Sequence, residues 1–417
     1  MNVSQLLEKT KEKCEEYWFC VKHRTRIQYF SREGKKLNFA IILMYVLRLV
    51  KKSAMIEIIK FFREIGKDDD PATRNGMNEA RAKIQHTAFV EIFELGVEAI
   101  KEMESAKTYK GYRLYAFDGS TELLEKSEEL EQYFGGTSSS VNHTMARLSC
   151  VVDVLNGGIV DGEIAPYNVG ERELAMQALG RIGNIANSIY MFDRGYWSPE
   201  LIDKMIGAKC KFLMRIPVNA KKCVTKSPEN SGFFDIEYEG RTHTLRYYKF
   251  TLSSGELEIL VTNLTHEEMP DELLPELYTK RWGIETKYLE LKIRLEIDRF
   301  SGKSVLFVKQ DFFATLAISN IVAMFAHEHN LKLEKKNKHK SLKNPQKTNV
   351  ALGIGVFREY FIEIMLCSST KHRNKLFDKL FKLISLSVSC DRSDRLQHDR
   401  DRFAIKNRRA NRPKSVL

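Results

Sequence analysis

The chain has 417 residues, of which 43% are hydrophobic and 10% aromatic, and its formal net charge is +12. This hydrophobic content is ordinary for a globular protein and excludes a fully disordered chain. At roughly 100–200 residues per domain, the length predicts two or three domains.

The positive charge is concentrated at the two ends of the chain. Residues 1–110 carry a net charge of +5, residues 111–330 carry −7, and residues 331–417 carry +14. Basic flanks suggest contact with a polyanion, and an acidic middle suggests carboxylates that hold metal ions. Solubility alone is the alternative explanation, and the charge by itself does not exclude it.

Nothing in the sequence predicts export or a membrane partner. The first 18 residues are charged throughout and lack the apolar run of a signal peptide. The longest apolar stretches, residues 37–47 and 312–326, are shorter than the 18 or more residues of a membrane span and predict buried helices. The seven cysteines include no CxxC pair, which fits a reducing compartment, so we expect a cytoplasmic protein.

The N-terminal region, residues 1–110, has apolar residues at helical spacing and predicts a helical domain. A break at Asp-Pro-Ala-Thr precedes a short basic segment that carries Arg74, Arg81 and Lys83. This pattern resembles a helix-turn-helix, whose second helix enters the major groove of DNA. A short basic helix with a solvated face is the simpler alternative.

From Gly111 onward the pattern is that of an α/β domain. An apolar run ends in Asp118, a hairpin follows with its bend at residues 156–158, and a second apolar run ends in Asp193. Residues 219–270 alternate in the manner of strands joined by glycine turns and predict an all-β insertion.

Three segments predict loops or linkers. Residues 134–142 are rich in Gly and Ser and predict a mobile loop. The charged run at residues 331–347 predicts a solvated linker, and the end of the chain predicts a flexible basic tail that contacts phosphates.

The segment of residues 278–292 predicts a helix with an unusual polar face. At about 100° per residue, Tyr278, Arg281, Glu285 and Lys292 all fall on one narrow face. An exposed ion pair between Arg281 and Glu285 is the simplest explanation of part of this row.

Three carboxylates indicate chemistry when they are taken together. Asp118 and Asp193 each follow an apolar strand, and ligand-binding groups collect at the carboxyl ends of strands in α/β sheets. Each aspartate alone is more typical of a turn or a helix cap. With Glu285 they would supply the oxygen ligands that hard divalent cations need, and two such cations suit phosphodiester transfer.

The order Asp118, Asp193, Glu285, with a β-rich insertion before the glutamate, resembles the DDE transposases of bacterial insertion sequences. The contexts YAFDGS and YMFDRGY around the two aspartates agree with this, as do GERELA at residues 170–175 and NEARAKIQHTAF at residues 78–89. The resemblance covers roughly residues 40–330.

The polar row on the predicted helix carries the most specific part of the resemblance. The spacing of Tyr278, Arg281, Glu285 and Lys292 matches, without a gap, the Tyr-Arg-Glu-Lys signature of insertion-sequence family four. In such a protein Glu285 would complete the metal site, and the other three side chains would bind phosphates of the terminal nucleotides.

The resemblance implies an α/β fold with an RNase H-like core, a mixed sheet flanked by helices. The core would comprise residues 111–218 and 271–330, interrupted by the β-rich insertion of residues 219–270. A helical DNA-binding domain of residues 1–110 would precede it, and a basic helical region of residues 331–417 with a flexible tail would follow.

The implied activity is metal-dependent DNA cleavage and strand transfer by a cut-and-paste route. Asp118, Asp193 and Glu285 would be the catalytic residues and would bind two Mg²⁺ or Mn²⁺ ions. The partners would be double-stranded DNA, as inverted repeats and as target, and a second copy of the chain in a homodimer. The protein would work at the bacterial nucleoid.

A hairpin intermediate is a secondary prediction, because the relatives that form one place a tryptophan in the β insertion. The three tryptophans here lie elsewhere, at Trp18, Trp197 and Trp282. Another aromatic residue, such as Tyr247, Tyr248 or Phe250, would have to stack on the flipped base.

Two other functions compete with transposition. The first is a catalytically inactive DNA-binding regulator of transposase ancestry, and the second is an RNase H-like nuclease that cuts without joining. The three intact carboxylates argue against the regulator, and a nuclease has no need of the full polar row.

Overall fold

The computed structural model describes residues 1–32, 34–137, 143–342 and 344–390. Part of the predicted loop, residues 138–142, and the predicted basic tail from residue 391 onward lie outside the described residues. The chain forms two compact units. Among the described residues, the helical unit contains Met1–Glu104, Leu124–Tyr133 and residues 289–390, and the sheet unit contains Ser105–Leu123 and Phe134–Tyr288.

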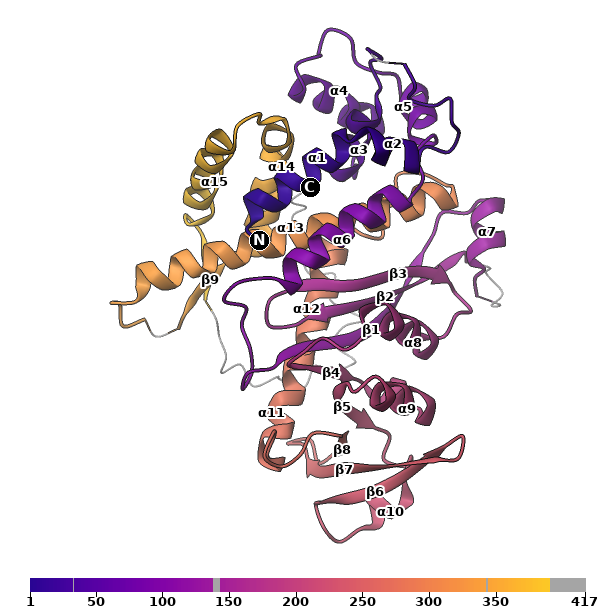
Figure 1. The fold of residues 1–417 in the computed structure, drawn as a ribbon, viewed down its shortest axis with the longest axis vertical. Helices are drawn as coiled ribbons and strands as arrows, with labels where there is room; N and C mark the ends of the chain where they lie inside the picture. Colours follow the sequence, from indigo (N-terminus) through magenta and orange to yellow (C-terminus); the bar gives the residue numbers. More distant parts are fainter. Residues whose placement is uncertain (33, 138–142, 343, 391–417) are drawn as a thin grey trace. The chain divides into compact units, whose positions relative to one another are not determined.

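The helical unit confirms the predicted helical N-terminus and adds helices from the C-terminal part of the chain (Figure 1). Its N-terminal helices are α1 (Val3–Glu15), α2 (Tyr17–His23), α3 (Phe39–Leu47), α4 (Ala54–Glu64), α5 (Arg74–Arg81) and α6 (Thr87–Lys101). Its later elements are most of α7 (Glu128–Phe134), then α13 (Val305–Asn337), α14 (Val350–Leu366), α15 (Thr370–Ile384) and the short strands β9 (Gln346–Thr348) and β10 (Val388–Cys390).

Helix α13 forms the centre of the helical unit and packs against α6, α3, α1 and α14. Its apolar residues surround the whole helix, and nearly every side chain from Gln310 to Phe325 is buried. This confirms the buried helix predicted at residues 312–326. The helix is long and apolar enough to cross a membrane, but 78% of that window is buried within the protein, as in a core helix. Its last residues reach Asn337, so the predicted linker is partly helical.

The sheet unit contains one mixed sheet of eight strands flanked by helices. The strands are β1 (Arg113–Leu123), β2 (Met145–Asp153), β3 (Gly158–Pro166), β4 (Ser188–Phe192), β5 (Lys211–Ile216), β6 (Ser231–Tyr238), β7 (Arg241–Thr251) and β8 (Leu257–Thr262). Their order is β3-β2-β1-β4-β5-β8-β7-β6. The pairs β1–β4 and β4–β5 are parallel, and all other pairs are antiparallel.

The first five strands form the RNase H-like core that the resemblance implied: three antiparallel strands followed by two parallel ones. Helix α8 (Glu171–Ile182) packs against β1, β2 and β3, and α9 (Pro199–Gly207) packs against β5 and β6. The short helix α10 (Lys222–Lys226) precedes β6. Side chains of the central strands are almost fully buried, for example Phe117 and Phe192, whose rings stack 4.5 Å apart.

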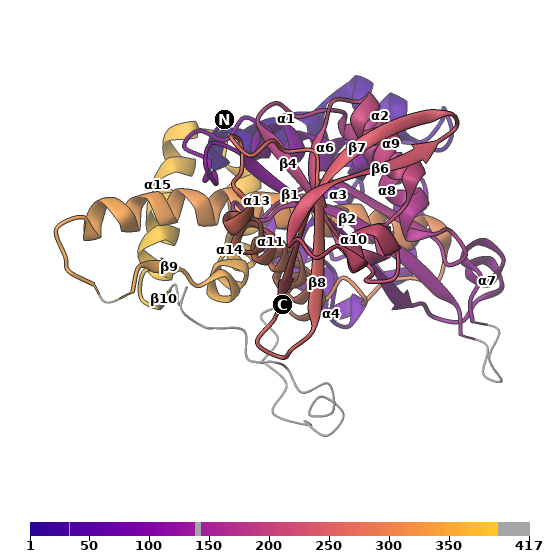
Figure 2. The ribbon, with the colours of Figure 1, turned by 90° about the horizontal axis from the view of Figure 1, so that it is seen from below.

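The predicted β insertion of residues 219–270 forms strands, but these strands do not make a separate sheet. Strand β8 pairs with β5, so β8, β7 and β6 extend the core sheet at its free edge. Strands β6 and β7 form a hairpin that Figures 1 and 2 show side by side, with Glu239 and Gly240 at positive φ in its turn.

The single helix predicted at residues 278–292 is interrupted. The segment consists of α11 (Leu274–Thr279), a 3₁₀ turn (Lys280–Trp282), α12 (Gly283–Leu289) and a π-helical turn (Glu290–Arg294). Gly283 lies so close to the strand side of the unit that an added Cβ would be 2.7 Å from the Cβ of Val154. Because the 3₁₀ and π-helical turns depart from 100° per residue, regular α-helical spacing does not hold along the whole row from Tyr278 to Lys292.

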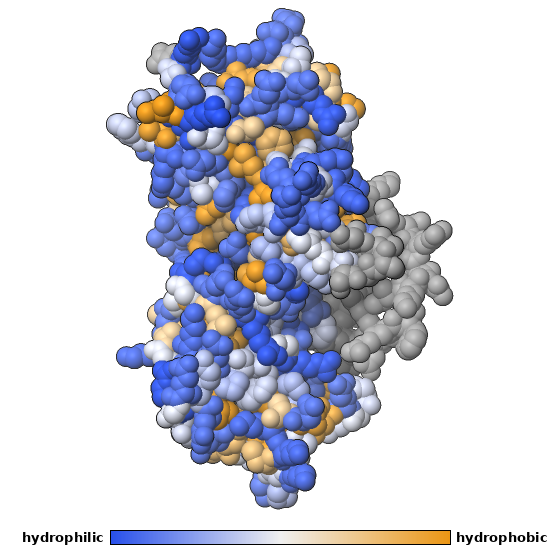
Figure 3. Space-filling model, turned by 90° about the vertical axis from the view of Figure 1, so that its right-hand side faces the viewer, coloured by the Kyte–Doolittle hydropathy of each residue, from blue (hydrophilic) through white to orange (hydrophobic). Residues whose placement is uncertain are grey.

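The face of the molecule drawn in Figure 3 is mostly hydrophilic. On the face drawn in Figure 3, hydrophobic side chains are scattered among charged and polar ones. Scattered apolar side chains are normal for a folded protein and need no partner to cover them.

Candidate active site

Asp118 and Asp193 lie side by side because of the register of two parallel strands. Strands β1 and β4 pair as far as Ala116 and Met191, and each aspartate follows two residues later. Neighbouring strands lie about 4.8 Å apart, so residues at equal offsets from a paired position are neighbours. The structure thus brings together the two acids that the sequence places 75 residues apart.

Asp118 does not end its strand, contrary to the prediction from the sequence. Strand β1 continues to Leu123, paired with β2, and only its pairing with β4 stops before Asp118. Because β1 and β4 no longer pair beyond Ala116 and Met191, the edge of β1 at Asp118 is not covered by β4. Asp193 directly follows β4 and also caps a short 3₁₀ turn, because its Oδ1 accepts a hydrogen bond from the Arg194 N–H at 2.7 Å.

Tyr278 and Arg281 bring the segment around α12 to these aspartates. The Tyr278 hydroxyl donates to Asp193 Oδ1 at 3.3 Å, and Arg281 Nη2 donates to Glu285 Oε1 at 3.0 Å. Burial opposes the charge of Arg281, but Tyr278, Asp193, Glu285 and Asp118 together raise the pKa of the guanidinium. Arg281 therefore lies within electrostatic reach of all three predicted catalytic acids.

The electrostatics of Asp118 reflect this concentration of acids. Burial is the main cause that raises the pKa of Asp118 to about 6. Arg281 and the Gly119 N–H oppose the rise, whereas Glu285 and Glu171 add to it. The carboxylate form of Asp118 is thus destabilised in the protein alone, and a bound cation would stabilise it.

Further residues of the site were not found from the sequence. Arg215, in β5, places its Nε 3.5 Å from Asp193 Oδ1 and also pairs with Glu258 of β8. The Tyr288 hydroxyl donates to the backbone oxygen of Asp118 at 2.9 Å and so ties α12 to β1. A charged residue inside the otherwise apolar run of β5 was a signal that could have identified Arg215.

The carboxylate oxygens of Asp118, Asp193 and Glu285 are of the kind that a hard divalent cation prefers, but they do not surround a common point in this conformation. Among the described residues, no three Asp, Glu, His or Cys side chains surround a common point as metal ligands. Glu285 accepts a hydrogen bond from Arg281, so it would have to exchange this partner for a cation. The donor set of carboxylate oxygens from two strands and a helix fits Mg²⁺ or Mn²⁺.

Lys292 belongs to a different compact unit from the other members of its row. It lies in the π-helical turn of the helical unit, whereas Tyr278, Arg281 and Glu285 belong to the sheet unit. The spacing in the sequence alone therefore does not show that Lys292 lies beside Tyr278, Arg281 and Glu285.

The three N-terminal residues predicted to contact DNA, Arg74, Arg81 and Lys83, differ in how accessible they are. Arg81 is only 2% exposed, and its guanidinium donates to Gln310 at 2.6 Å and to Asp311 at 2.8 Å. This side chain holds α5 to α13 and is not available to DNA in this conformation. Arg74, at the start of α5, is exposed.

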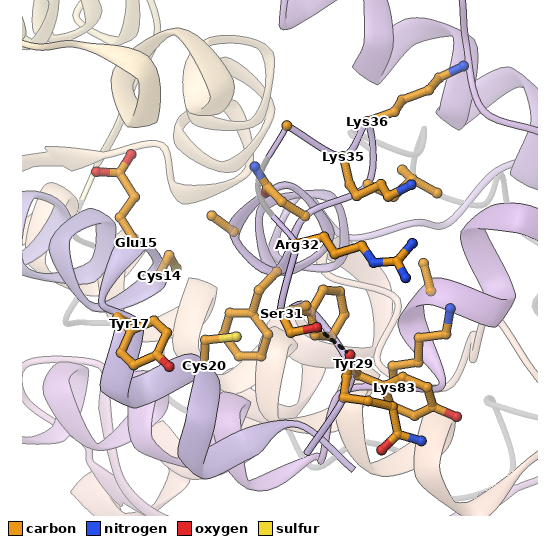
Figure 4. Close-up of a pocket in the computed structure, with 18 of the residues that line it drawn as sticks. Cys14, Glu15, Tyr17, Cys20, Tyr29, Ser31, Arg32, Lys35, Lys36 and Lys83 are labelled. Atoms are coloured by element: carbon orange, nitrogen blue, oxygen red, sulfur yellow. Dashed lines mark hydrogen bonds between the residues drawn. The ribbon is translucent and has the colours of Figure 1, made fainter. Parts of the chain in front are cut away.

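Lys83 lines a cavity of about 930 Å³ in the helical unit, together with other basic and aromatic side chains. Figure 4 shows Arg32, Lys35 and Lys83 on one side of this cavity and Glu15 on the other. The Lys83 Nζ lies 5.3 Å from the centre of the Tyr29 ring. Basic and aromatic groups in this combination suit a nucleic-acid surface.

Comparison with known proteins identifies the family. Residues 109–321 match the protein family described as the transposase DDE domain. No curated protein sequence matches the chain. One similar solved structure is a cryo-EM structure of the piggyBac transposase synaptic complex with hairpin DNA. It is 9% identical, covers 90% of this chain and 85% of that chain, and has a TM-score of 0.47.

The family match spans just over half of the residues and includes Asp118 in β1, Asp193 directly after β4, and Glu285 in α12. The chain belongs to the family of transposases with a DDE domain.

Proposed function

We propose that this protein is the transposase of a bacterial insertion sequence of family four, which binds the terminal inverted repeats of its element and then cuts and joins DNA. Asp118, Asp193 and Glu285 are its catalytic residues and hold two Mg²⁺ or Mn²⁺ ions. The observation that carries this proposal is the equal register of Asp118 and Asp193 beside the Arg281–Glu285 pair.

The cations, when bound, supply the Lewis acid that activates a water or a 3′-hydroxyl for attack on a phosphodiester. The protein groups around them have complementary tasks. Tyr278 already donates to Asp193 and so orients it. Arg281 presents a planar, always charged fork that binds a phosphate bidentately once Glu285 releases it. Arg215 fixes Asp193 from the β5 side.

Lys292 and Arg74 are proposed as further contacts to phosphates, and Lys83 as a contact within the basic cavity. These contacts position DNA without reading its sequence. We further propose a homodimer in which two copies hold two transposon ends, working on DNA at the nucleoid in the cytoplasm.

A hairpin step would need an aromatic platform on the β-rich extension of the sheet. Tyr247 is buried and donates to Ser227 Oγ at 2.9 Å, so it is committed to packing. Tyr248 and Phe250 are half-buried, and their rings stack 6.1 Å apart on β7. These two residues are the better candidates for stacking on a flipped base.

Incubation of the purified protein with Mg²⁺ and paired DNA ends tests the proposal. The DNA is taken from the short inverted repeats expected on both sides of the reading frame. Cleavage followed by joining supports transposition. Binding without cleavage would instead identify a regulator, and cleavage without joined products would identify a nuclease.

A further inference from the structure

We infer that one side of helix α15, in the helical unit, is a binding surface for the phosphate backbone of double-stranded DNA. This surface, which we call the lysine face, consists of Lys371, Lys375, Lys379 and Lys382. It binds the duplex by charge and does not read its sequence. The inference goes beyond the proposed function, whose contacts to DNA all lie outside this helix.

The four lysines share one side of a regular α-helix. At about 100° per residue they fall within an arc of about 80°, and all four residues are exposed. Along the helix axis, the face is about 16 Å long from Lys371 to Lys382. The opposite side carries five buried apolar residues, which are Leu376, Phe377, Leu380, Phe381 and Ile384.

Contacts of the buried side hold α15 in place. The helix packs against α14 and α1, and Figure 1 shows it beside α14. Arg373 places its Nη1 3.1 Å from Glu8 Oε1 of α1, and its Nη2 donates to the backbone oxygen of Cys367 at 3.2 Å. The lysine face is therefore presented to solvent by a helix whose apolar side is already covered.

Acidic neighbours do not neutralise the lysine face. Asp378 is the only acidic residue of α15, and it pairs with Lys332 of α13 at 3.0 Å. Helix α14 carries two exposed glutamates. Even so, none of the four lysines forms an ion pair with any residue that the structure describes. The Lys379 Nζ lies 4.8 Å from the centre of the Tyr360 ring instead.

The spacing of these lysines argues against a face that serves only solubility. Lys371, Lys375 and Lys379 follow one another at four-residue intervals, where like charges repel on a helix surface. A solvated helix face more often mixes both signs, as on α1, where Lys9 and Glu12 are both exposed. Phosphates would relieve the repulsion, since each strand of a duplex carries a charge about every 3.4 Å of its axis.

Two other partners fit this surface less well. A second copy of the chain, related by a twofold axis, would bring lysines against lysines. A membrane-surface helix inserts its apolar side between lipids, but here that side is buried within the protein. Duplex DNA needs only the exposed charges.

The salt dependence of DNA binding tests the lysine face. The full-length protein, in EDTA to prevent cleavage, is titrated into a labelled duplex of random sequence, and fluorescence anisotropy is measured over a range of KCl concentrations. One variant combines Lys371→Gln, Lys375→Gln and Lys382→Gln, and a second replaces the same residues by Arg. The control combines Lys52→Gln, Lys67→Gln and Lys126→Gln, at exposed positions outside α15.

The slope of log affinity against log salt should be less steep by about 2–3 in the α15 glutamine variant, because each lost phosphate contact removes about 0.9. Its affinity at low salt should fall at least about tenfold. The arginine variant and the control should keep the wild-type slope. If circular dichroism shows that the glutamine variant does not fold, the single variant Lys371→Gln replaces it, with an expected change of about 1.

Four results would overturn the inference. They are a wild-type slope in the α15 glutamine variant, an equal loss in the control, a loss confined to DNA that carries the inverted repeat, and a wild-type affinity for DNA combined with lost binding to phosphatidylserine vesicles or an altered oligomeric state. All four leave the catalytic proposal intact, because no cleavage is measured. If the wild type did not bind duplex DNA at all, the lysine face and the proposed function would both be wrong.

Discussion

Two arginines of this protein are almost equally buried and yet belong to different kinds of network. In the helical unit, the side chains of Arg81 and Asp311 are 3% and 7% exposed. Asp311 also accepts from the N–H and the hydroxyl of Ser301, both at 2.7 Å. In the sheet unit, Arg281 is 6% exposed, but its partner Glu285 is 40% exposed.

The difference lies in how completely each network is satisfied. Arg81 has partners for its Nε and both terminal nitrogens, whereas the Nε of Arg281 is buried with no hydrogen-bond partner among the described residues. A closed network stabilises the fold, and an open one keeps donors and acceptors for a ligand. This comparison separates a structural arginine from one that we propose binds DNA.

The largest expected effect comes from the acids of the open network. Asp118→Asn, Asp193→Asn or Glu285→Gln should each reduce strand joining by about a thousandfold or more, because each removes a charge from the proposed cation site. Binding to end DNA should persist in a mobility-shift assay. Asp203→Asn is the control, since Asp203 pairs with Arg241 and His243 away from the three acids. Joining at the parental rate by a variant would remove that residue from the site.

Substitutions in the closed network around Arg81 should lower the stability of the protein. Arg81→Met should lower the free energy of unfolding by about 3–5 kcal/mol, because it leaves the carboxylate of Asp311 buried without its cation. Urea denaturation of the full-length protein measures this loss. Arg74→Met, at an exposed position of the same helix, should change stability by less than about 0.5 kcal/mol. A stable Arg81→Met protein that no longer binds DNA would reverse the assignment.

Arg281→Lys tests whether the arginine of the sheet unit serves DNA rather than the stability of the fold. It keeps the charge but loses the fork, so strand joining should fall about ten- to a hundredfold while the free energy of unfolding changes little. Joining kinetics and thermal denaturation on the same preparation give both quantities. A large loss of stability with unchanged joining would make Arg281 a structural residue like Arg81.

The smallest effect concerns a buried neutral group of the helical unit. His329 bonds to the hydroxyls of Thr348 and Ser385, and burial lowers its pKa to about 4. The unfolded chain therefore takes up a proton more readily than the folded one. Stability is complete above about pH 6.5 and is lost as the pH falls toward 4, by about 1–2 kcal/mol between pH 7 and pH 5.

Denaturation at several pH values, with His329→Asn beside His372→Gln, checks this pH dependence. His372 is exposed in α15, so its variant should keep the wild-type profile. The His329→Asn profile should be flatter over this interval. Equal slopes in the two variants would contradict the assignment.

The sequence predicted those parts of the fold that follow from local pattern. Apolar periodicity predicted the N-terminal helices and the buried segment of α13, and the Asn-Gly-Gly bend predicted the β2–β3 hairpin. The pairing of β8 with β5 was missed, because alternation predicts a strand but not the partner of its edge.

In the candidate active site, too, local pattern predicted some features, whereas contacts between distant residues were missed. Two apolar runs that each end in an aspartate predicted that Asp118 and Asp193 meet, and the parallel register brings them together. The burial of Arg81 was missed, because its partners Gln310 and Asp311 lie more than 200 residues away in sequence.

We propose above all that Asp118, Asp193 and Glu285 hold divalent cations at one site in the complex with DNA. Anomalous diffraction from Mn²⁺ in crystals of the protein bound to its transposon end tests this claim most directly. We expect anomalous peaks within bonding distance of all three carboxylates, with Arg281 moved from Glu285 to a phosphate. Peaks elsewhere in the protein, or an Arg281–Glu285 pair that stays closed beside bound DNA, would contradict it.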